Sequence, residues 1–554
     1  MLTAESGSIQ SPTRIGQSFR SSTKASRLTS VSSALELVVG KAIGRSCTAI
    51  NPLSGISISY ELINRGLTVV MLEAREVLSG ETGRTSGHLA WDLDDGFTEI
   101  AAKHGAEATK KAFQSHQWAS DHVGRIAKQL DIECEYRKLP GYDVSQYPKS
   151  DPKHEDDIKM LQQEVAKAKE LGFQAEWRPG YAVRGWDGKI DQRDAAVFPD
   201  QATFHPTKYL IGVMKWLAEQ PKFSCYTHSR ASDVSEKGMK VLGLGSKKVE
   251  VTTEEGHIVT CKNAVEATCV PLQKLSVVAE MEYMRTYCIA VRIPKGSVED
   301  CLLYDSADAY KYIRMTKCDD NDDYMVIGGC DHKVGQHPQE EREYDELERW
   351  VRERFTHAGG VDYKWSGQIY DPIDYMAMIG KNPGCDQIYI VTGDSGNGLT
   401  HGVLAGRLIA DEITGAENEW ASVYNPKRVG TFLKKAPQML AHDLQINAQY
   451  RRFLQSDIHD IEDLKPGQGG VLNPTLGKPI ACYKDENGKV TKVSAICPHL
   501  KGVVCWNSAE QSWDCPIHGS RFSKEGIQLN GPAFLNLNPV DDEAARLQKS
   551  AAKA

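Results

Sequence analysis

Two short motifs near the C-terminus of this 554-residue sequence constrain its fold more than any other feature. Cys497 and His499 are separated by one residue, and Cys515 and His518 by two. Facing loops with this spacing can present two thiolates and two imidazoles toward one another. The sequence therefore predicts a small metal-binding domain over residues 461–540, with these four side chains as ligands.

The predicted ligand set fits two kinds of metal centre. In a Rieske [2Fe–2S] cluster, two Cys hold one iron and two His hold the other. A tetrahedral Cys2His2 zinc site uses the same atoms. Zinc motifs usually open with two cysteines two to four residues apart, and neither motif here does so. The spacing therefore favours a [2Fe–2S] cluster over zinc.

The residues around both motifs resemble Rieske ferredoxin-type domains, notably residues 518–522 and, at the place of that family's proline loop, residues 531–533. In high-potential relatives one more Cys in each loop forms a disulfide, but Gly502 and Ile517 occupy those places here. Phe522 replaces a hydrogen-bonding Tyr. Fewer hydrogen bonds to the sulfurs imply a potential low in the Rieske range of roughly −150 to +300 mV.

The whole chain is too long for one hydrophobic core and predicts two to four domains. Its net charge of −8 gives no electrostatic reason to expect nucleic acid as a partner. No apolar run is long enough for a membrane span. The 14 cysteines are scattered, which predicts buried thiols in a reducing, cytoplasmic setting rather than a disulfide framework.

Both ends of the chain read as tails. Residues 1–33 are rich in Ser and Thr, carry several basic residues and contain one acid, Glu5. This composition predicts disorder, and it also permits a mitochondrial targeting segment, so a mitochondrial location is the alternative. Residues 541–554 are the second expected tail.

A strand, helix, strand pattern follows the first tail. Residues 35–40 and 67–72 read as buried strands, residues 56–65 as the helix between them, and Glu73 follows the second strand. This is the order of a dinucleotide-binding βαβ unit, in which the acid binds a ribose hydroxyl. Glu73 therefore indicates the adenosine ribose of FAD or NAD, with a solvated strand end as the alternative.

A loop rich in Gly, Ser, Thr and Arg follows the acid. Small residues let backbone amides approach a pyrophosphate or a flavin, and hydroxyls add donors. Together with the βαβ unit, this loop resembles the D-amino-acid oxidase-like (DAO) flavoprotein family, in which it wraps the FAD. The resemblance implies FAD as cofactor, with contacts from Glu73, Ala74, Arg75, Thr82, Gly83, Arg84, Thr85 and Ser86.

The glycine fingerprint of that family is altered here. When its third glycine is matched to Gly55, Ile50 and Pro52 stand at the first two glycine positions. Neither residue supplies both the tight turn and the close approach to the pyrophosphate. Residues 41–54 then form a surplus segment, which is either an insertion from an incorrectly spliced gene model or a real loop that weakens FAD binding. Sequencing the transcript across residues 38–56 distinguishes the two.

Two later segments also resemble the DAO family. The buried strand at residues 264–268 stands at the family's strand beneath the cofactor. Residues 392–402 follow an apolar strand and open a helix, whose free N–H groups can stabilise an electron-rich flavin edge. With Gly55, the resemblance adds these expected FAD contacts: Ala267, Thr268, Gly393, Asp394, Gly396, Asn397, Gly398 and Thr400.

A substrate subdomain is expected at about residues 275–365, beyond two long polar helices at residues 98–130 and 156–171. Tyr310, Tyr312 and Arg314 alternate, which places two phenols and a guanidinium on one strand face. Aromatic walls with an Arg suit an amino or carboxylic acid. These three residues are therefore the substrate-site candidates, although a solvent-facing strand would look the same. No side chain stands out as a general base, and the cofactor supplies the chemistry.

The expected architecture over residues 34–415 is an α/β FAD-binding domain, Rossmann-like and of the DAO/glutathione-reductase type. This region includes the α+β substrate domain. A connector at residues 416–460 leads to the small all-β Rieske domain. The expected function is an FAD-dependent oxidoreductase that oxidises a small amine, amino acid or related substrate. It would exchange electrons with an unidentified donor or acceptor through the [2Fe–2S] cluster. The alternative is a non-catalytic Rieske electron carrier with a vestigial flavin fold.

Overall fold

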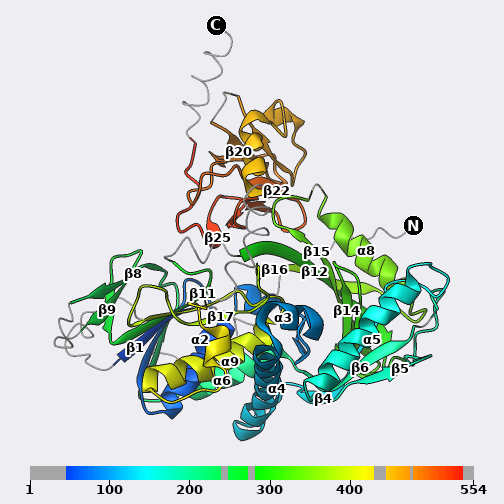
Figure 1. The fold of residues 1–554 in the computed structure, drawn as a ribbon. Coiled ribbons are helices and arrows are strands. Elements are labelled where there is room, and N and C mark those ends of the chain that lie inside the picture. Colours follow the sequence, from blue (N-terminus) through cyan, green and yellow to red (C-terminus); the bar gives the residue numbers. More distant parts are fainter. Residues whose placement is uncertain are drawn as a thin grey trace.

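Strand β1 (Arg45–Ile50) lies inside a six-stranded sheet that forms one half of the larger part of the molecule (Figure 1). The computed structural model describes residues 45–50, 52–191, 193–238, 247–272, 281–337, 339–428, 445–474 and 478–540. The sheet order is β17-β18-β11-β1-β2-β7, parallel except for β17. The other five strands are β2 (Thr68–Leu72), β7 (Phe223–Tyr226), β11 (Asn263–Cys269), β17 (Met378–Lys381) and β18 (Ile388–Thr392).

Strand β1 corrects the expected start of the βαβ unit. Residues 35–40 lie outside the described residues, and residues 45–50 pair in parallel with β11 and β2 on either side. Helix α2 (Pro52–Asn64) begins two residues after the strand ends. The prediction that residues 41–54 form a surplus loop is therefore wrong for residues 45–50 and 52–54. A polar strand sequence hid this element, and only its pairing with two neighbours reveals it.

Helices cover one face of the six-stranded sheet. Helix α2 packs against α9 (Gly398–Thr414), and α6 (Pro206–Ala218) lies beside it (Figure 1). A Cβ at Gly402 would lie 2.8 Å from Leu53, and one at Gly406 would lie 2.9 Å from the Ser57 carbonyl oxygen. The two glycines, four residues apart on α9, therefore let α2 approach closely. The short helix α10 (Ala421–Tyr424) follows α9.

The long helix expected at residues 98–130 is two helices, α3 (Gly96–His104) and α4 (Ala106–Gln129). The chain turns at Gly105, where φ is +83°, a conformation that glycine adopts at little cost. Helix α5 (His154–Glu170) agrees with the second prediction to within two residues. On the other side of the sheet, an antiparallel three-stranded sheet consists of β8 (Ala231–Lys237), β9 (Lys248–Thr253) and β10 (Ile258–Cys261).

A nine-stranded sheet forms the second half, in the order β16-β12-β15-β14-β13-β4-β6-β3 with β5 paired to β6. Its C-terminal strands are β12 (Met281–Pro294), β13 (Leu302–Asp305), β14 (Lys311–Lys317), β15 (Asp322–Lys333) and β16 (Val361–Pro372). Its N-terminal strands are β3 (His88–Leu89), β4 (Arg137–Val144), β5 (Glu176–Arg178) and β6 (Ala195–Thr203). The sheet is thus assembled from two stretches of chain. Helix α8 (Glu341–Arg352) packs on its apolar face.

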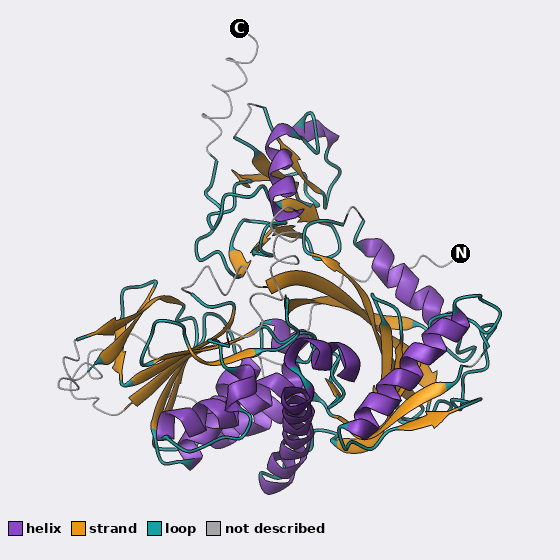
Figure 2. Ribbon diagram, viewed as in Figure 1, coloured by secondary structure: helices purple, strands orange, loops and turns teal. Residues whose placement is uncertain are grey.

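The C-terminal domain is built from short strands and sits beyond β12 and β16 (Figure 1). Figure 2 shows helical segments beside the strands of this domain. One sheet contains β19 (Gly469–Leu472), β20 (Ile480–Lys484) and β21 (Val490–Ser494), and the other β22 (Cys505–Asn507), β23 (Ser512–Asp514), β24 (Arg521–Ser523) and β25 (Gln528–Asn530). Two 3-10 helices, η4 (Gln449–Leu454) and η5 (Ile461–Asp463), precede the strands. The expected fold class is confirmed.

Within the described ranges, no helix has both the length and the apolar character that a bilayer span needs.

Candidate active site and metal centre

An open cleft, whose empty space together with the adjoining solvent is about 1060 Å³, lies between the six-stranded and the nine-stranded sheets. Its walls come from the loop after β2, from strands β12 to β16, and from the start of α9. Nine of the residues expected to contact FAD line it, namely Thr82, Arg84, Thr85, Ser86, Asp394, Gly396, Asn397, Gly398 and Thr400. The other eight lie outside its lining: Gly55, Glu73, Ala74, Arg75, Gly83, Ala267, Thr268 and Gly393.

The segments outside the lining still have the local geometry that the sequence indicated. Glu73 is buried directly after β2, and its carboxylate accepts a hydrogen bond from the Arg75 backbone N–H at 2.9 Å. Burial raises the pKa of Glu73. A Cβ at Gly83 would lie 2.2 Å from the Leu78 carbonyl oxygen, so only glycine fits the 3-10 turn η3 (Glu81–Arg84). Gly55 is buried in the first turn of α2.

Two helix starts face the cleft and suit a large anionic cofactor. Leu53 in the first turn of α2 and residues 398–400 in the first turn of α9 line it. Helix starts offer free N–H groups and a partial positive charge to phosphate or an electron-rich ring. Asp394 Oδ1 and Gln368 Oε1 are buried without a hydrogen-bond partner in the described part of the chain. The N–H donors of the helix starts and these two oxygen acceptors fit a polar ligand such as FAD.

The structure brings two of the three substrate-site candidates to the cleft. Tyr310 and Tyr312 line it, but Arg314 does not. Arg314 Nη1 donates to Thr203 Oγ1 at 3.3 Å, and its Nε donates to the Ser86 carbonyl oxygen. A Cβ at Gly87 would lie 2.7 Å from the guanidinium, so the chain at Gly87 closes directly over Arg314. Strand alternation placed Arg314 on the correct face, but the chain at Ser86 and Gly87 covers it there.

Four further residues of the lining were not singled out from the sequence: His88, Asp94, Tyr304 and Asp331. Asp331 stands in the segment 327–333, where an acid following the buried residues of β15 was the available signal. Burial raises the pKa of Asp94 to about 6 and that of Asp331 to about 7. No local pattern marked His88 or Tyr304.

The two metal-binding loops are built alike. In each, the Cys N–H donates to the carbonyl oxygen five residues on, at 2.8 Å for both Cys497 and Cys515. In each, the residue four positions later donates back to the Cys carbonyl oxygen, at 3.1 Å and 3.0 Å. This shared turn presents the thiols of Cys497 and Cys515 to each other, and their hydrogen bond lowers the pKa of Cys497.

The histidines form a second pair beside the thiols. The rings of His499 and His518 are 5.1 Å apart and nearly perpendicular. Burial lowers the pKa of His499, so its imidazole is available as a neutral ligand. In the described residues, no three His, Cys, Asp or Glu side chains converge on one ion. A thiol pair next to an imidazole pair fits a two-iron cluster better than a single zinc ion.

Ser520 is positioned to raise the potential of a cluster bound in these loops. It is fully buried, its hydroxyl hydrogen-bonds Cys497, and the Ala533 N–H fixes that hydroxyl at 2.9 Å. Ser520→Ala should lower the potential by roughly several tens of millivolts, because a donor to the sulfur favours the more negative reduced state. Protein-film voltammetry measures this, and an unchanged or higher potential would contradict it.

A buried ion-pair network joins the loop after β2 to the C-terminal domain. Glu510, with a side chain 9% exposed, pairs with Arg84 at 2.7 Å, Arg285 at 3.2 Å and Arg521 at 3.5 Å. Its Oε1 also accepts from the Ser366 hydroxyl at 2.5 Å. Burial opposes ionisation of Glu510, but the three guanidinium groups overcome it and lower its pKa strongly.

The metal-binding loop at Cys515 rests on the cleft wall. Gln368, which lines the cleft, donates from Nε2 to the Gly519 carbonyl oxygen at 2.9 Å. The ring of His518 lies 5.9 Å from that of Tyr283, which lies 5.7 Å from that of Tyr370, another lining residue. Two ring contacts therefore connect a predicted metal ligand to the cleft.

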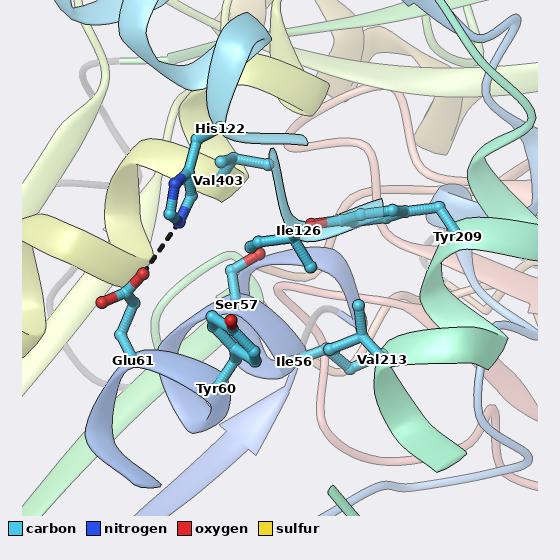
Figure 3. Close-up of a pocket in the computed structure, with 9 residues that line it drawn as sticks. All are labelled: Ile56, Ser57, Tyr60, Glu61, His122, Ile126, Tyr209, Val213 and Val403. Atoms are coloured by element: carbon cyan, nitrogen blue, oxygen red, sulfur yellow. Dashed lines mark hydrogen bonds and ion pairs between the residues drawn. The ribbon is translucent and has the colours of Figure 1, made fainter. Parts of the chain in front are cut away.

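A second, much smaller cavity lies among helices α2, α4, α6 and α9 (Figure 3). Its one polar contact among the labelled residues is between His122 and Glu61, at 2.9 Å. Glu61 also pairs with Arg65, and Ile56, Val213 and Val403 close the space. It is a gap in helix packing, and its lining shares no residue with the cleft.

Comparison with known proteins identifies both parts of the chain. The family model for FAD dependent oxidoreductase (DAO) matches residues 53–412, and that for the Rieske [2Fe-2S] domain matches residues 456–540. YhfW of Bacillus subtilis (strain 168), a Rieske 2Fe-2S iron-sulfur protein by name, is 26% identical over 494 residues. The match covers 88% of this chain and 92% of YhfW, so both proteins share the two-part organisation.

Solved structures share the fold of the larger part. Glycine oxidase from Geobacillus kaustophilus has a TM-score of 0.56 at 14% identity, covering 70% of this chain and 99% of its own. L-amino acid deaminase from Proteus vulgaris has a TM-score of 0.53 at 14% identity, covering 70% and 97%. The chain therefore belongs to the FAD dependent oxidoreductase (DAO) family, and it is an FAD enzyme with a C-terminal Rieske domain for a [2Fe–2S] cluster.

Proposed function

We propose that this enzyme oxidises a small amine or amino acid in the cleft and passes the electrons within the chain to its Rieske cluster, for delivery to an external acceptor. FAD takes two electrons from a substrate, commonly as a hydride, and a [2Fe–2S] cluster passes one at a time. The glycine oxidase and the amino acid deaminase with the same fold act on amino acids by name, which supports this substrate range.

The observation that carries the proposal is the seating of the cluster loop on the cleft wall. Gln368 belongs to the wall and binds the Gly519 carbonyl oxygen, and Tyr283 lies against His518. A redox group in the cleft and one in the loops would then be separated by two layers of side chains. The Glu510 ion pairs hold the two domains in this arrangement.

In this proposal the FAD contacts follow the family pattern. Glu73 binds the adenosine ribose, and Thr82 to Ser86 supply hydroxyl and amide donors along the cofactor. Residues 393–400 and the start of α9 face its flavin end. Tyr310 and Tyr312 contribute to the substrate wall.

Anaerobic titration of the purified holoenzyme with small amines and amino acids tests the proposed function. We expect a substrate that bleaches the flavin bands also to produce the electron paramagnetic resonance signal of the reduced cluster. The rate should not depend on protein concentration, because the transfer is intramolecular. A rate proportional to protein concentration would contradict internal transfer. Purified protein with a cluster but no flavin would favour the electron carrier instead.

A further inference from the structure

One wall of the cleft is a cluster of aromatic rings. The ring of His88 lies 4.7 Å from that of Tyr312 and 5.7 Å from that of Tyr304. Tyr310 completes the cluster, 5.6 Å from Tyr312 and 6.4 Å from Tyr304. Strands β3, β13 and β14 and the turn before β14 supply these rings. Ring faces of this kind attract organic cations.

Carboxyl groups stand among the rings. Asp94 accepts a hydrogen bond from Tyr310 Oη at 2.6 Å and one from Asn397 at 3.3 Å. Asp331 lines the same wall, and its Oδ1 is buried without a hydrogen-bond partner in the described part of the chain. The hydroxyl of Tyr304 likewise has none there. Unmet buried groups of this kind are costly unless a ligand satisfies them.

The protein offers these carboxyl groups little positive charge: Lys311 acts on Asp331 from outside the cleft lining, and burial outweighs its effect. Arg84 is the one Lys or Arg in the lining of the described cleft, and Glu510 and the Ser366 carbonyl oxygen already occupy its Nη1. Arg314 lies behind the chain at Ser86. His88 is neutral, since burial and the nearby Arg314 lower its pKa to about 3. A substrate carboxylate would find no Lys or Arg among the rings of this wall and would face two acids.

We infer that the wall formed by His88, Tyr304, Tyr312, Asp94 and Asp331 binds the ammonium group of an alkylamine that carries no carboxylate. This assignment rests on the proposed function and narrows its substrate range, because it excludes α-amino acids. The rings supply cation–π attraction, Asp331 supplies the charge, and the enclosed site strengthens both.

Cation binding should strengthen as the pH rises. Burial raises the pKa of Asp331 to about 7. A hydrogen bond with Thr286 and the charge of Lys311 lower this pKa, and Asp94 raises it further. Asp371 at the end of β16 interacts with the same group. Asp331 is neutral below this pKa and ionised above it, so affinity for a permanent cation should rise between about pH 6 and pH 8.

The test uses the oxidised holoenzyme and probes that are not substrates. Tetramethylammonium, the uncharged neopentyl alcohol of similar shape, and acetate are titrated at pH 8, with binding read from the flavin absorption change and from calorimetry. We expect tetramethylammonium to bind at least about tenfold more tightly than neopentyl alcohol, a difference of about 1.4 kcal/mol. Acetate should not bind. Asp331→Asn should remove the advantage of the cation, and Asp345→Asn, at an exposed position on α8, should leave it unchanged.

Several outcomes would overturn the assignment. These are acetate binding, equal binding of the cation and the alcohol, or equal behaviour of the two Asp variants. If Asp331→Asn does not fold, Tyr304→Leu replaces it, and the wild-type comparison of the three probes stands without any variant. Amino acids that bleach the flavin, with no tetramethylammonium binding, would uphold the proposed function and refute this inference. Cation binding in an enzyme that oxidises no amine or amino acid would uphold this inference and refute the proposed function.

Discussion

Glu510→Gln should slow electron transfer from the cleft to the cluster by at least about tenfold while both cofactors stay bound. The substitution keeps the shape of the side chain but removes a charge that Arg84, Arg285 and Arg521 share. Removing one partner of a buried ion pair typically costs about 3–5 kcal/mol, and a tenfold shift in a docking equilibrium needs only about 1.4 kcal/mol. The Rieske domain would then leave the cleft wall for part of the time.

Stopped-flow reduction of the holoenzyme measures this effect, with flavin bleaching and cluster reduction followed separately. Glu486→Gln is the matched control, since Glu486 is exposed on the same domain. Flavin bleaching should be unchanged in both variants. Cluster reduction as fast in Glu510→Gln as in wild type would show that the ion pairs do not set the docked arrangement.

The same carboxylate predicts how docking depends on pH. Because the guanidinium groups lower the pKa of Glu510, its stabilising contribution is fully present above the ordinary pKa of a glutamate. The contribution is lost as the pH falls through the lowered value in the folded protein. Docking should therefore be insensitive to pH near neutrality and weaken only on strong acidification.

Cys515→Ser should remove the cluster entirely and leave the flavin in place. The two thiols form one pair of the metal-binding loops, and one thiolate with a hydroxyl is a poor substitute for a thiolate pair. The visible absorption and the paramagnetic resonance signal of the cluster should disappear, together with the bound iron and sulfide. The oxidisable substrate should still bleach the flavin, but electrons should no longer leave through the Rieske domain.

Iron, sulfide and flavin analysis of the purified variant tests this prediction. Cys505→Ser is the control, because Cys505 is a free cysteine of the same domain on β22. It should retain the cluster. A wild-type protein that contains one zinc ion and no sulfide would contradict the cluster assignment as a whole.

The sequence alone was sufficient for features that depend on neighbouring residues. The metal-binding loops are an example, because one short turn sets the spacing within each Cys and His pair. The strand β2 followed by Glu73, and the strand β18 followed by the start of α9, are also local patterns, and both were predicted. The resemblance carried by these patterns implied the two domain families and both cofactors.

Sequence reasoning failed where a distant part of the chain decides whether a strand forms or a side chain is covered. Strand β1 is specified by pairing with β11 and β2, rather than by its own apolar content. Arg314 has the correct strand alternation, but the chain at Ser86 and Gly87, more than 200 residues earlier, covers it. The break at Gly105 depended on one glycine within a helical pattern.

The sequence by itself therefore determined that this chain has a flavin fold and a cluster domain, because spacing within a strand, turn or loop encodes the ligands. Only the tertiary structure decided how the flavin fold and the cluster domain contact each other. Arg84 and Glu510 are 426 residues apart, and Asp94 and Tyr310 are 216 apart, yet each pair is in direct contact. Contacts of this range depend on sheet order and on which faces are buried against each other, and local residue patterns do not contain that information.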